Sequence, residues 1–330
     1  MQKGARNIYC TLFDSAYLSR GLIMYESLRD YTVDFHLFIF AFDDLSLEIL
    51  KKLNLLNTTI ISQKEFETQD LLDVKHHRTK AEYCWTCSSS VIAYVFDNFK
   101  VISCTYLDAD LFFYDSAEII LNEIPADKSV LITEHRFSKS AQFFEMKKAG
   151  RFCVQFITFF NTNDSIAVLN KWKSQSIEWC YARYEDGKFG DQKYLDTWPN
   201  DYHNVHILQH LGGGVAPWNA KSADFNFDGD KILGSDHRTR QQFDVIFFHF
   251  HFVRIMFNGY ADLGWNWLPA SIIEGFYRPY VNKIMEKEEF LEKTFSQYKR
   301  VLTHPNQKSF REILKTLFKK TFGYNLIKLP

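Results

Sequence analysis

Two aspartates, Asp108 and Asp110, stand two residues apart in the segment Tyr106-Leu107-Asp108-Ala109-Asp110-Leu111-Phe112-Phe113. Carboxylates inside an apolar context are costly unless something pairs with them. A hard divalent cation that holds a diphosphate is one such partner. An ordinary strand end with two solvated acids would show the same pattern, so the motif alone leaves both interpretations open.

Two histidines, His249 and His251, alternate with phenylalanines in Phe247–Phe252. In a strand, period-two spacing places both imidazoles on one face, and imidazole is a suitable ligand for Mn²⁺ or Zn²⁺. A pair of hydrogen-bonded core histidines is the alternative. Arg254 follows closely; it could reach a phosphate, or it could be a solvated charge at a strand end.

Asp191 and Gln192 follow Gly190 at a predicted helix start. An aspartate at this position could simply cap the helix. A carboxylate beside an amide could instead bind sugar hydroxyls or face a reacting anomeric centre.

The six cysteines do not form the dense pattern of a disulfide scaffold, which favours a reducing, cytosolic compartment. Cys84 and Cys87 form a lone C-x-x-C inside a helical pattern, so we expect them to be structural rather than redox-active or zinc-binding. The apolar runs are far shorter than the ~20 residues that a membrane-spanning helix needs. We therefore expect a cytoplasmic protein.

The elements that would position these side chains alternate along the first half of the chain. Strand-like apolar runs occupy residues 7–13, 35–42, 58–61 and 101–107, and helix-like patterns occupy 15–31, 45–53 and 80–99. Such alternation predicts an α/β protein whose largely parallel sheet is covered on both faces. Ligands of such sheets bind outside the carboxyl ends of the strands, where Asp108 and Asp110 would lie.

The second half is less regular. We expect strands at 129–133, 152–160 and 243–252, a helix at 163–184, and helices after Pro269.

The composition narrows the class of protein. Hydrophobic residues make up 46% and charged residues 24% of the 330 residues, which excludes a disordered chain. The formal net charge of −1 gives no reason to expect a nucleic-acid partner. Aromatic residues reach 17%, which fits a large aromatic core or a stacking platform for a flat ligand.

In their order, these motifs resemble the GT-A nucleotide-diphospho-sugar glycosyltransferases over about residues 7–255. They look most like glycosyltransferase family 8 and related bacterial polysaccharide enzymes. The resemblance implies a Rossmann-like, three-layer α/β/α fold with a central mostly parallel mixed sheet, plus C-terminal helices. It also implies that Asp108 and Asp110 hold Mn²⁺ or Mg²⁺ together with the donor diphosphate. His249 would complete the metal site, with His251 as a further possible ligand.

The resemblance divides the chain into a GT-A catalytic domain, 1–268, and a helical basic extension, 269–330. The donor-binding half of the catalytic domain would be about 1–115 and the acceptor-side half about 116–268.

The same resemblance assigns further roles at the donor site. Thr11 and Asp14 match the opening strand and turn, where an aspartate contacts the nucleotide base; a helix N-cap is the alternative for Asp14. Lys80 and Arg254 would bind phosphate. Asp191 and Gln192 match the catalytic pair that lines the donor-sugar pocket.

Two departures concern substrate contacts. The family's Asn-x-Gly strand is not present around Gln155, which could take over a sugar contact or be a buried, hydrogen-bonded strand residue. The family's Lys-Pro-Trp after the histidine is missing as well. The segment Ala216-Pro217-Trp218-Asn219 is similar to that motif but precedes His249. Trp218 and Asn219 are therefore candidate substrate residues, although Trp218 could equally be a core residue.

The implied function is metal-dependent transfer of a sugar from a nucleotide-diphosphate donor, with a UDP-sugar expected. The acceptor would be a glycan or a lipid-linked saccharide, in bacterial surface polysaccharide synthesis. A non-catalytic sugar-binding or scaffolding protein of the same fold is one alternative. A glycoside hydrolase with two working carboxylates is another.

The C-terminal segment carries its own signal. Residues 300–330 hold seven basic residues against one acid, Glu312, a net charge of +6. Residues 305–330 could form a helix on an anionic membrane surface at the cytoplasmic face of the inner membrane. The alternative is a helix that packs its apolar face on the catalytic domain and leaves its lysines in solvent. The apolar face would comprise Phe310, Ile313, Leu314, Leu317 and Phe318, and the basic face Arg311, Lys315 and Lys319.

Overall fold

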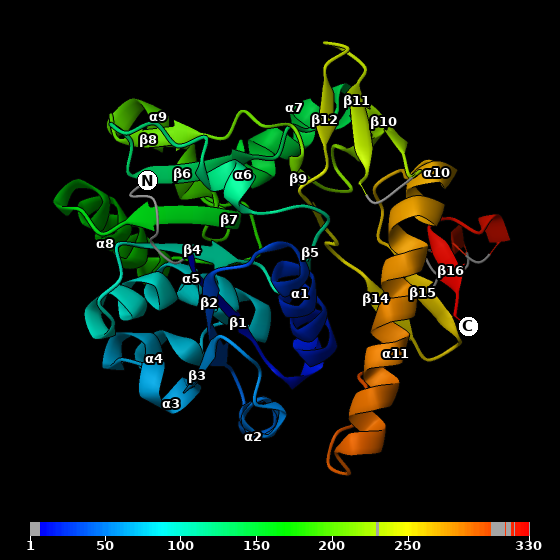
Figure 1. The fold of residues 1–330 in the computed structure, drawn as a ribbon, viewed down its shortest axis with the longest axis horizontal. Helices are drawn as coiled ribbons and strands as arrows, with labels where there is room; N and C mark the ends of the chain where they lie inside the picture. Colours follow the sequence, from blue (N-terminus) through cyan, green and yellow to red (C-terminus); the bar gives the residue numbers. More distant parts are fainter. Residues whose placement is uncertain (1–6, 229–230, 305–313, 315–317, 320, 330) are drawn as a thin grey trace.

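Seven strands form a central sheet in the order β3-β2-β1-β4-β7-β6-β8 (Figure 1). The computed structural model describes residues 7–228, 231–304, 314, 318–319 and 321–329. β7 runs antiparallel to both of its neighbours, and the other neighbouring pairs of this sheet are parallel. The mixed, mostly parallel sheet implied by the resemblance is therefore confirmed. The strands are β1 Asn7–Phe13, β2 Phe35–Ala41, β3 Thr58–Ser62, β4 Ser103–Leu107, β6 Val130–Glu134, β7 Phe152–Phe160 and β8 Val205–Ile207.

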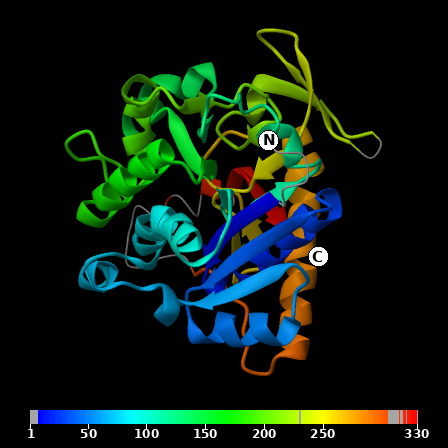
Figure 2. The same cartoon turned by 60° about the vertical axis from the view of Figure 1, so that its left-hand side comes forward.

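Helices cover both faces of this sheet, because alternate side chains of each buried strand point to opposite sides. In β1, Tyr9 and Phe13 pack with α1 (Leu18–Tyr31) and α2 (Asp44–Leu53). Cys10 and Leu12 of the same strand pack with α5 (Lys80–Asn98) and α8 (Asn163–Glu178). The result is the expected three-layer α/β/α arrangement, seen from a second side in Figure 2.

The start of α5 is set by a capping box. Thr79 Oγ1 accepts a hydrogen bond from the backbone N–H of Glu82, and the Glu82 carboxylate accepts one from the backbone N–H of Thr79. These reciprocal bonds satisfy N–H groups that a helix start leaves without intrahelical partners. They hold the first turns of α5 at the carboxyl edge of the sheet.

Three small sheets of the described chain are built mainly from its second half, with β5 added from the first half. They are β10-β11-β12 (Ala223–Asn226, Leu233–Asp236, Gln242–Asp244), β5-β13-β9 (Leu111–Phe113, Phe247–His249, Gly213–Val215) and β14-β15-β16 (Arg254–Met256, Tyr260–Asp262, Leu326–Lys328).

The prediction of a single strand over residues 243–252 is wrong. The chain forms β12 and β13 there, which pair in different sheets, and turns after His249. The carbonyl of Ile246, between the two strands, accepts hydrogen bonds from the backbone of Tyr114 and Asp115. The helix expected over 163–184 also ends early, at Glu178, because Trp179 adopts an extended conformation.

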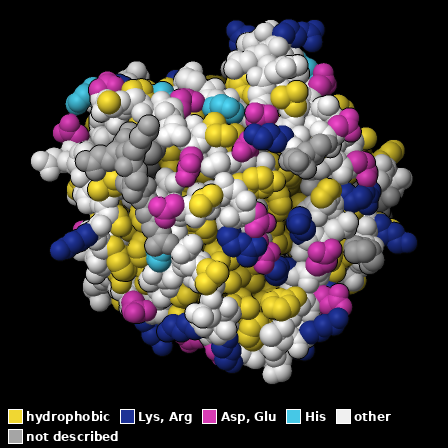
Figure 3. Space-filling view, in the orientation of Figure 1, with side chains coloured by type: hydrophobic (Ala, Val, Ile, Leu, Met, Phe, Trp, Pro, Cys, Tyr) yellow, Lys and Arg dark blue, Asp and Glu magenta, His cyan; other side chains and the backbone are white. Residues whose placement is uncertain are grey.

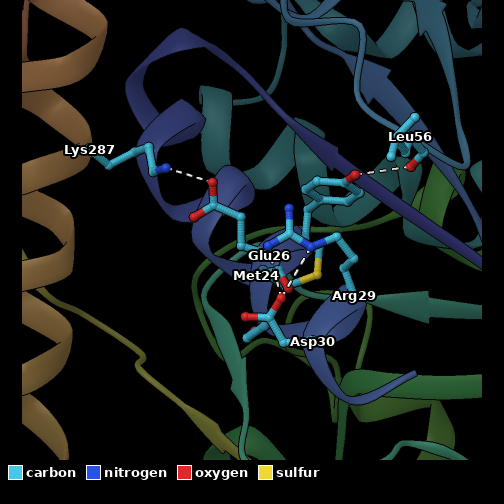
Figure 4. A network of polar contacts seen from close by, with 8 residues as sticks. Met24, Glu26, Arg29, Asp30, Leu56 and Lys287 are labelled. Atoms are coloured by element: carbon cyan, nitrogen blue, oxygen red, sulfur yellow. Dashed lines mark hydrogen bonds and ion pairs between the residues drawn. The ribbon is translucent and has the colours of Figure 1, made fainter. Parts of the chain in front are cut away.

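The C-terminal helix α11 (Arg278–Thr294) packs along α1 (Figure 1). The buried Glu288 carboxylate accepts hydrogen bonds from Ser19 Oγ at 2.6 Å and Tyr298 Oη at 2.8 Å. Near the surface, Lys287 pairs with Glu26 at 2.6 Å (Figure 4). A cavity of about 300 Å³ lies between the two helices, where apolar side chains adjoin charged ones (Figure 3).

The remaining helices are short. They are α3 Gln63–Phe66, α4 Gln69–Lys75, α6 Glu118–Leu121, α7 Lys139–Ala149, α9 Trp198–Asp201 and α10 Ala270–Ile272. Within the described parts of the chain, no helix combines the length and the apolar character needed to cross a bilayer.

Candidate active site

A cavity of about 810 Å³ opens at the carboxyl edge of the central sheet. Asp14 follows β1, Asp108 follows β4 and His135 follows β6, and all three line this cavity. The first turns of α5 form another part of its wall. The structure thus brings together, at the edge where ligands of such sheets bind, side chains that are far apart in the sequence.

Asp108, Asp110 and His249 form a compact cluster in this cavity. His249 Nε2 lies 3.0 Å from Asp110 Oδ1 and 3.6 Å from Asp108 Oδ2. Antiparallel pairing of β5 with β13 sets these distances, because it places His249 opposite Leu111, the residue after Asp110. One ligand atom from each side chain lies within 4.8 Å of the others, a spacing that could hold one metal ion.

Gln155 orients the imidazole of His249 from behind. Gln155 is fully buried in β7, and its Oε1 lies 2.7 Å from His249 Nδ1. When Nδ1–H donates to this amide oxygen, Nε2 presents its lone pair toward the two carboxylates, as metal-binding histidines usually do. Gln155 lies outside the cavity wall, so the structure gives it the buried, hydrogen-bonded position rather than a sugar contact.

The charges of the cluster perturb one another's pKa values. Burial and the neighbouring Asp110 raise the pKa of Asp108, although the charge of His249 opposes them. Burial also acts to raise the pKa of Asp110, but the charge and hydrogen bond of His249 hold it below its ordinary range. Burial acts to lower the pKa of His249, yet Asp110 raises it well above its usual value. Without a cation, the imidazole of His249 therefore carries a proton, and its positive charge offsets the carboxylate charge that a metal ion would neutralise.

Asp191 and Gln192 line the same cavity. Burial raises the pKa of the Asp191 carboxyl to about 7, although a hydrogen bond from Ser88 opposes this shift. The backbone carbonyl of Asp191 accepts a hydrogen bond from Trp172 Nε1 at 2.9 Å, which ties this segment to α8.

The alternative role of Asp191 as a helix cap is wrong. The following 3-10 helix, Lys193–Thr197, is preceded by Gln192, whose amide donates to the carbonyl of Ala149 at 2.7 Å. Both side chains are therefore placed by contacts other than a cap.

The residues expected to bind nucleotide and phosphate divide between the cavity and its surroundings. Asp14 lines the cavity and also caps the short 3-10 helix Ser15–Tyr17, accepting from Ala16 N at 3.0 Å. The exposed Lys80 ammonium lies at the mouth, 3.8 Å from Asp14. Thr11 is fully buried within β1 and does not reach the wall. The exposed Arg254 stacks on Phe252, which itself lines the cavity. The donor-binding roles of Thr11 and Arg254 stay predictions.

Trp218 and Asn219 differ in position. Trp218 is 8% exposed and packs edge-on against His249, with ring centroids 5.3 Å apart, so it buttresses the cluster while also lining the cavity. The Asn219 amide donates to the carbonyls of His135 and Gly214 and accepts from Ala216 N. Asn219 therefore holds the loop together and lies outside the cavity wall, and its contact with substrate stays a prediction.

His251 does not join the three-residue cluster. The chain turns after His249, so the two imidazoles do not continue one strand face, and their ring centroids are 5.8 Å apart. His251 lies in the cavity wall, where it contacts the edge of Trp218.

Two residues at the site were missed by the sequence reasoning. Arg20 is buried in α1, donates to the carbonyl of Val253 at 2.9 Å, and helps to lower the pKa of Asp110. Its signal was a charged residue between the core positions Leu18 and Leu22. Trp265 lines the cavity in a loop that also carries Gly264; two tryptophans beside a glycine were the only hint.

Cys84 lines the cavity from α5, and Cys87 of the same helix is buried in the core. Burial raises the pKa of Cys84 to about 12 and that of Cys87 well above its ordinary value, so both remain thiols at neutral pH. Neither belongs to a group of potential metal ligands in the described part of the chain. This placement agrees with the structural role expected of them.

Part of the C-terminal tail lies outside the described residues, including Phe310, Arg311, Ile313, Lys315 and Leu317. In the described part of the tail, the exposed and buried side chains are the opposite of those expected for a helix that packs its apolar face on the catalytic domain. Leu314 and Phe318 are exposed, whereas Lys319 is buried against Asp262. The expectation that Lys319 belongs to an outer basic face is therefore wrong.

Comparisons with known proteins give distant likenesses. No protein-family model matches the chain. Two Bacillus subtilis (strain 168) proteins, both described as uncharacterized, are similar to it. YfnD is 25% identical over 296 residues, which cover 88% of this chain and 92% of YfnD. YfnF is 29% identical over 254 residues, which cover 75% and 82%.

Among solved structures, the chain is similar to the galactosyltransferase LgtC in complex with donor and acceptor sugar analogues. The TM-score is 0.49 at 13% identity, over 74% of this chain and 87% of LgtC. The bifunctional glycosyltransferase WbbM gives a TM-score of 0.42 at 12% identity, over 66% of this chain and 40% of WbbM. At such distances the chemistry of the chain has to be inferred from its own side chains.

Proposed function

We propose that this protein is a metal-dependent glycosyltransferase that moves a sugar from a nucleotide-diphosphate donor to a saccharide acceptor. The observation that carries this proposal is one cavity, at the carboxyl edge of a mostly parallel sheet, that contains both a three-ligand cluster and a buried carboxyl. The cluster is Asp108, Asp110 and His249, and the buried carboxyl is Asp191.

The cluster fits a hard or borderline divalent cation. Carboxylate oxygens suit Mg²⁺ and Mn²⁺, and imidazole nitrogen is a common ligand of transition metals such as Mn²⁺. Asp108, Asp110 and His249 would hold the ion, and Gln155 would keep His249 in the tautomer that binds it. The ion would supply Lewis-acid stabilisation of the negative charge that develops on the leaving diphosphate.

The other cavity residues would bind and orient the donor. The ammonium of Lys80 at the mouth can neutralise phosphate charge. Asp14 can accept hydrogen bonds from a nucleoside. In its ionised form, Asp191 would stabilise positive charge on the sugar ring as the anomeric bond breaks. Gln192, beside it, would orient the sugar hydroxyls.

The finer parts of the proposal come from the resemblance. They are a UDP-sugar donor, a glycan or lipid-linked acceptor, and a role in bacterial surface polysaccharide synthesis. A peripheral position on the cytoplasmic face of the inner membrane would bring the enzyme to a lipid-linked acceptor. The exposed Leu314, Phe318 and Phe322 support that position, because apolar side chains at an interface favour membrane contact.

One observation favours a second candidate, a glycoside hydrolase. The pKa of Asp191 is raised to about 7 while that of Asp110 lies below its ordinary range. Carboxyl groups whose pKa values are pushed apart are typical of an acid and its partner carboxylate in hydrolases. A hydrolase would need neither a nucleotide nor a cation at the cluster, whereas a non-catalytic sugar-binding protein would bind ligand without turnover.

Isothermal titration with UDP, GDP and CDP, with and without Mn²⁺, tests the proposal. We expect binding of at least one nucleotide that requires Mn²⁺ and disappears in excess EDTA. The Asp110→Asn variant should bind that nucleotide roughly 100-fold more weakly, while the matched control Asp97→Asn, at an exposed position of α5, should bind as the wild type does. Nucleotide binding that is indifferent to EDTA would contradict the metal site, and no binding of any nucleotide would favour the hydrolase.

A further inference from the structure

The loop Gly264–Asn266 forms part of the cavity wall, and its backbone is held by the C-terminal segment. The carbonyl of Gly264 accepts hydrogen bonds from Lys319 Nζ at 2.6 Å and from Asn325 Nδ2 at 3.2 Å. The carbonyl of Trp265 accepts one from Tyr324 Oη at 3.0 Å, and the carbonyl of Asn266 accepts another from Asn325. Three consecutive carbonyls of the loop therefore depend on side chains some 60 residues further along the chain.

The same segment is anchored as a strand. β16 pairs antiparallel with β15, next to the loop (Figure 1). The buried Lys319 forms an ion pair with Asp262 at the end of β15. On the other side of the loop, Gly264 has φ +83°, and a Cβ atom there would lie 3.0 Å from the Phe252 ring. Only glycine therefore fits this close approach of the loop backbone to the Phe252 ring.

This scaffold presents one aromatic side chain, Trp265, at the cavity mouth. Lys319 Nζ lies 4.5 Å from the centroid of its ring. The rings of Phe318 and Tyr324 are inclined to it by 28° and 29°, with centroids at 6.2 and 5.8 Å. Despite these contacts, Trp265 remains 44% exposed. A large, rigid aromatic surface at a binding-site rim commonly serves as a stacking platform.

We propose that Trp265 is the platform on which the acceptor sugar stacks, and that Lys319, Tyr324 and Asn325 are positioning residues for it. This inference rests on the proposed glycosyltransferase function. Trp265 and the metal cluster line the same cavity, and Trp265 is exposed, so an acceptor sugar on its ring would share the cavity with a donor diphosphate at the cluster. Trp218 is the less suitable platform, because it is nearly buried and its ring packs against the imidazoles of His135 and His249.

The inference gives the C-terminal segment a role in the site. Removing residues 305–330 would remove β16 and the side chains of Lys319, Tyr324 and Asn325, which bind the loop carbonyls in the described part of the chain. The tail would therefore affect acceptor recognition directly, whether or not it also contacts a membrane.

The test measures sugar binding with the donor site filled. Methyl β-galactoside, methyl β-glucoside and N-acetylglucosamine are titrated into full-length protein saturated with UDP and Mn²⁺, and saturation-transfer NMR reports contact with the sugar ring. Trp265→Ala should weaken the binding of the preferred sugar about tenfold, and Trp265→Phe should retain most of it. The matched control is Trp267→Ala, since Trp267 is 57% exposed but does not line the cavity.

Tyr324→Phe tests the positioning role with little risk to folding, because it removes only the hydroxyl that donates to the Trp265 carbonyl. It should weaken sugar binding about threefold in the wild type and cause no further loss in the Trp265→Ala background, since coupled residues are not additive. Additive losses would show that Tyr324 acts independently of Trp265 and would overturn its positioning role.

The outcomes separate this inference from the function on which it rests. If UDP binds with Mn²⁺ but Trp265→Ala leaves sugar binding unchanged, or if no sugar binds the wild type, the inference is wrong and the proposed function stands. If UDP does not bind with Mn²⁺, the proposed function itself fails. UDP binding that is equal in wild type and Trp265→Ala, together with lost sugar binding, supports both.

Discussion

Replacing Asp191 by asparagine should stabilise the protein, and more so as the pH rises. In the folded chain burial raises the pKa of this carboxyl to about 7, whereas an unfolded chain would show the ordinary 3.8. Between these values the folded state retains a proton that the unfolded state has released, so the wild type loses stability as the pH rises through this window. Asparagine keeps a side chain of the same shape and removes the titration.

The size of the effect follows from linkage. A shift of one pKa unit corresponds to about 1.4 kcal/mol. For pKa values of 3.8 and about 7, the carboxyl destabilises the fold by about 1.7 kcal/mol at pH 5 and by about 4 kcal/mol at pH 8. The advantage of Asp191→Asn over the wild type should therefore grow by about 2.5 kcal/mol between the two pH values, whatever constant offset the substitution adds.

Urea unfolding followed by circular dichroism at pH 5 and pH 8, in EDTA, measures this difference. Asp97→Asn is the control, because the same chemical change at an exposed position of α5 should alter stability little at either pH. An advantage of Asp191→Asn that is equal at pH 5 and pH 8 would refute the assigned burial of this carboxyl. If the ionised carboxylate works in catalysis, wild-type activity should also rise between pH 6 and 8, and the stabilised variant should be inactive throughout.

Three further outcomes are expected. Gln155→Leu removes the acceptor of His249 Nδ1 and should weaken Mn²⁺ affinity 10- to 100-fold, measured by titration with UDP present; unchanged affinity would show that Gln155 does not orient the histidine. With a pKa of about 12, Cys84 should react with iodoacetamide at pH 8 about 10³-fold more slowly than free cysteine, and metal analysis of Cys84→Ala/Cys87→Ala should show no zinc lost; either a fast thiol or lost stoichiometric zinc would contradict the structural role. Phe322→Ser should reduce sedimentation with anionic vesicles at low salt if the exposed aromatic side chains of the tail contact lipid; equal sedimentation of both proteins would argue against that contact.

Much of the fold was predictable because its first half obeys simple periodicities. The runs around Tyr9, Phe38 and Cys104 are mostly apolar, and in the structure they are buried at consecutive positions, as expected for strands buried on both faces. The helix over 80–99 showed a helical apolar pattern and begins with a capping box. Such signals are local, so they can be recognised without knowledge of the rest of the chain.

The predictions failed where two distant segments decide the local conformation. The run 243–252 is mostly apolar, yet it splits because β12 pairs with β11 and β13 pairs with β5 and β9. Nothing in the run itself marks the break at Ile246. The carbonyl of Ile246 accepts hydrogen bonds from the backbone N–H groups that follow β5. The burial of Thr11 and Asn219 could not be read from the local sequence for a similar reason, since their surroundings come from other segments.

The sequence by itself determined which chemistry the site can offer and at which edge of the sheet it lies. Asp108 and Asp110 follow a buried strand, and parallel strands collect their carboxyl ends at one edge. Only the tertiary structure decided which of the candidate side chains meet there. It selected His249 over His251 through the β5–β13 register, placed Gln155 behind the imidazole, and brought Lys319 and Asn325 to the loop that carries Trp265. The physical reason is that a hydrogen bond or an ion pair depends on distances of about 3 Å, and those distances are set by strand pairing between residues far apart in the chain.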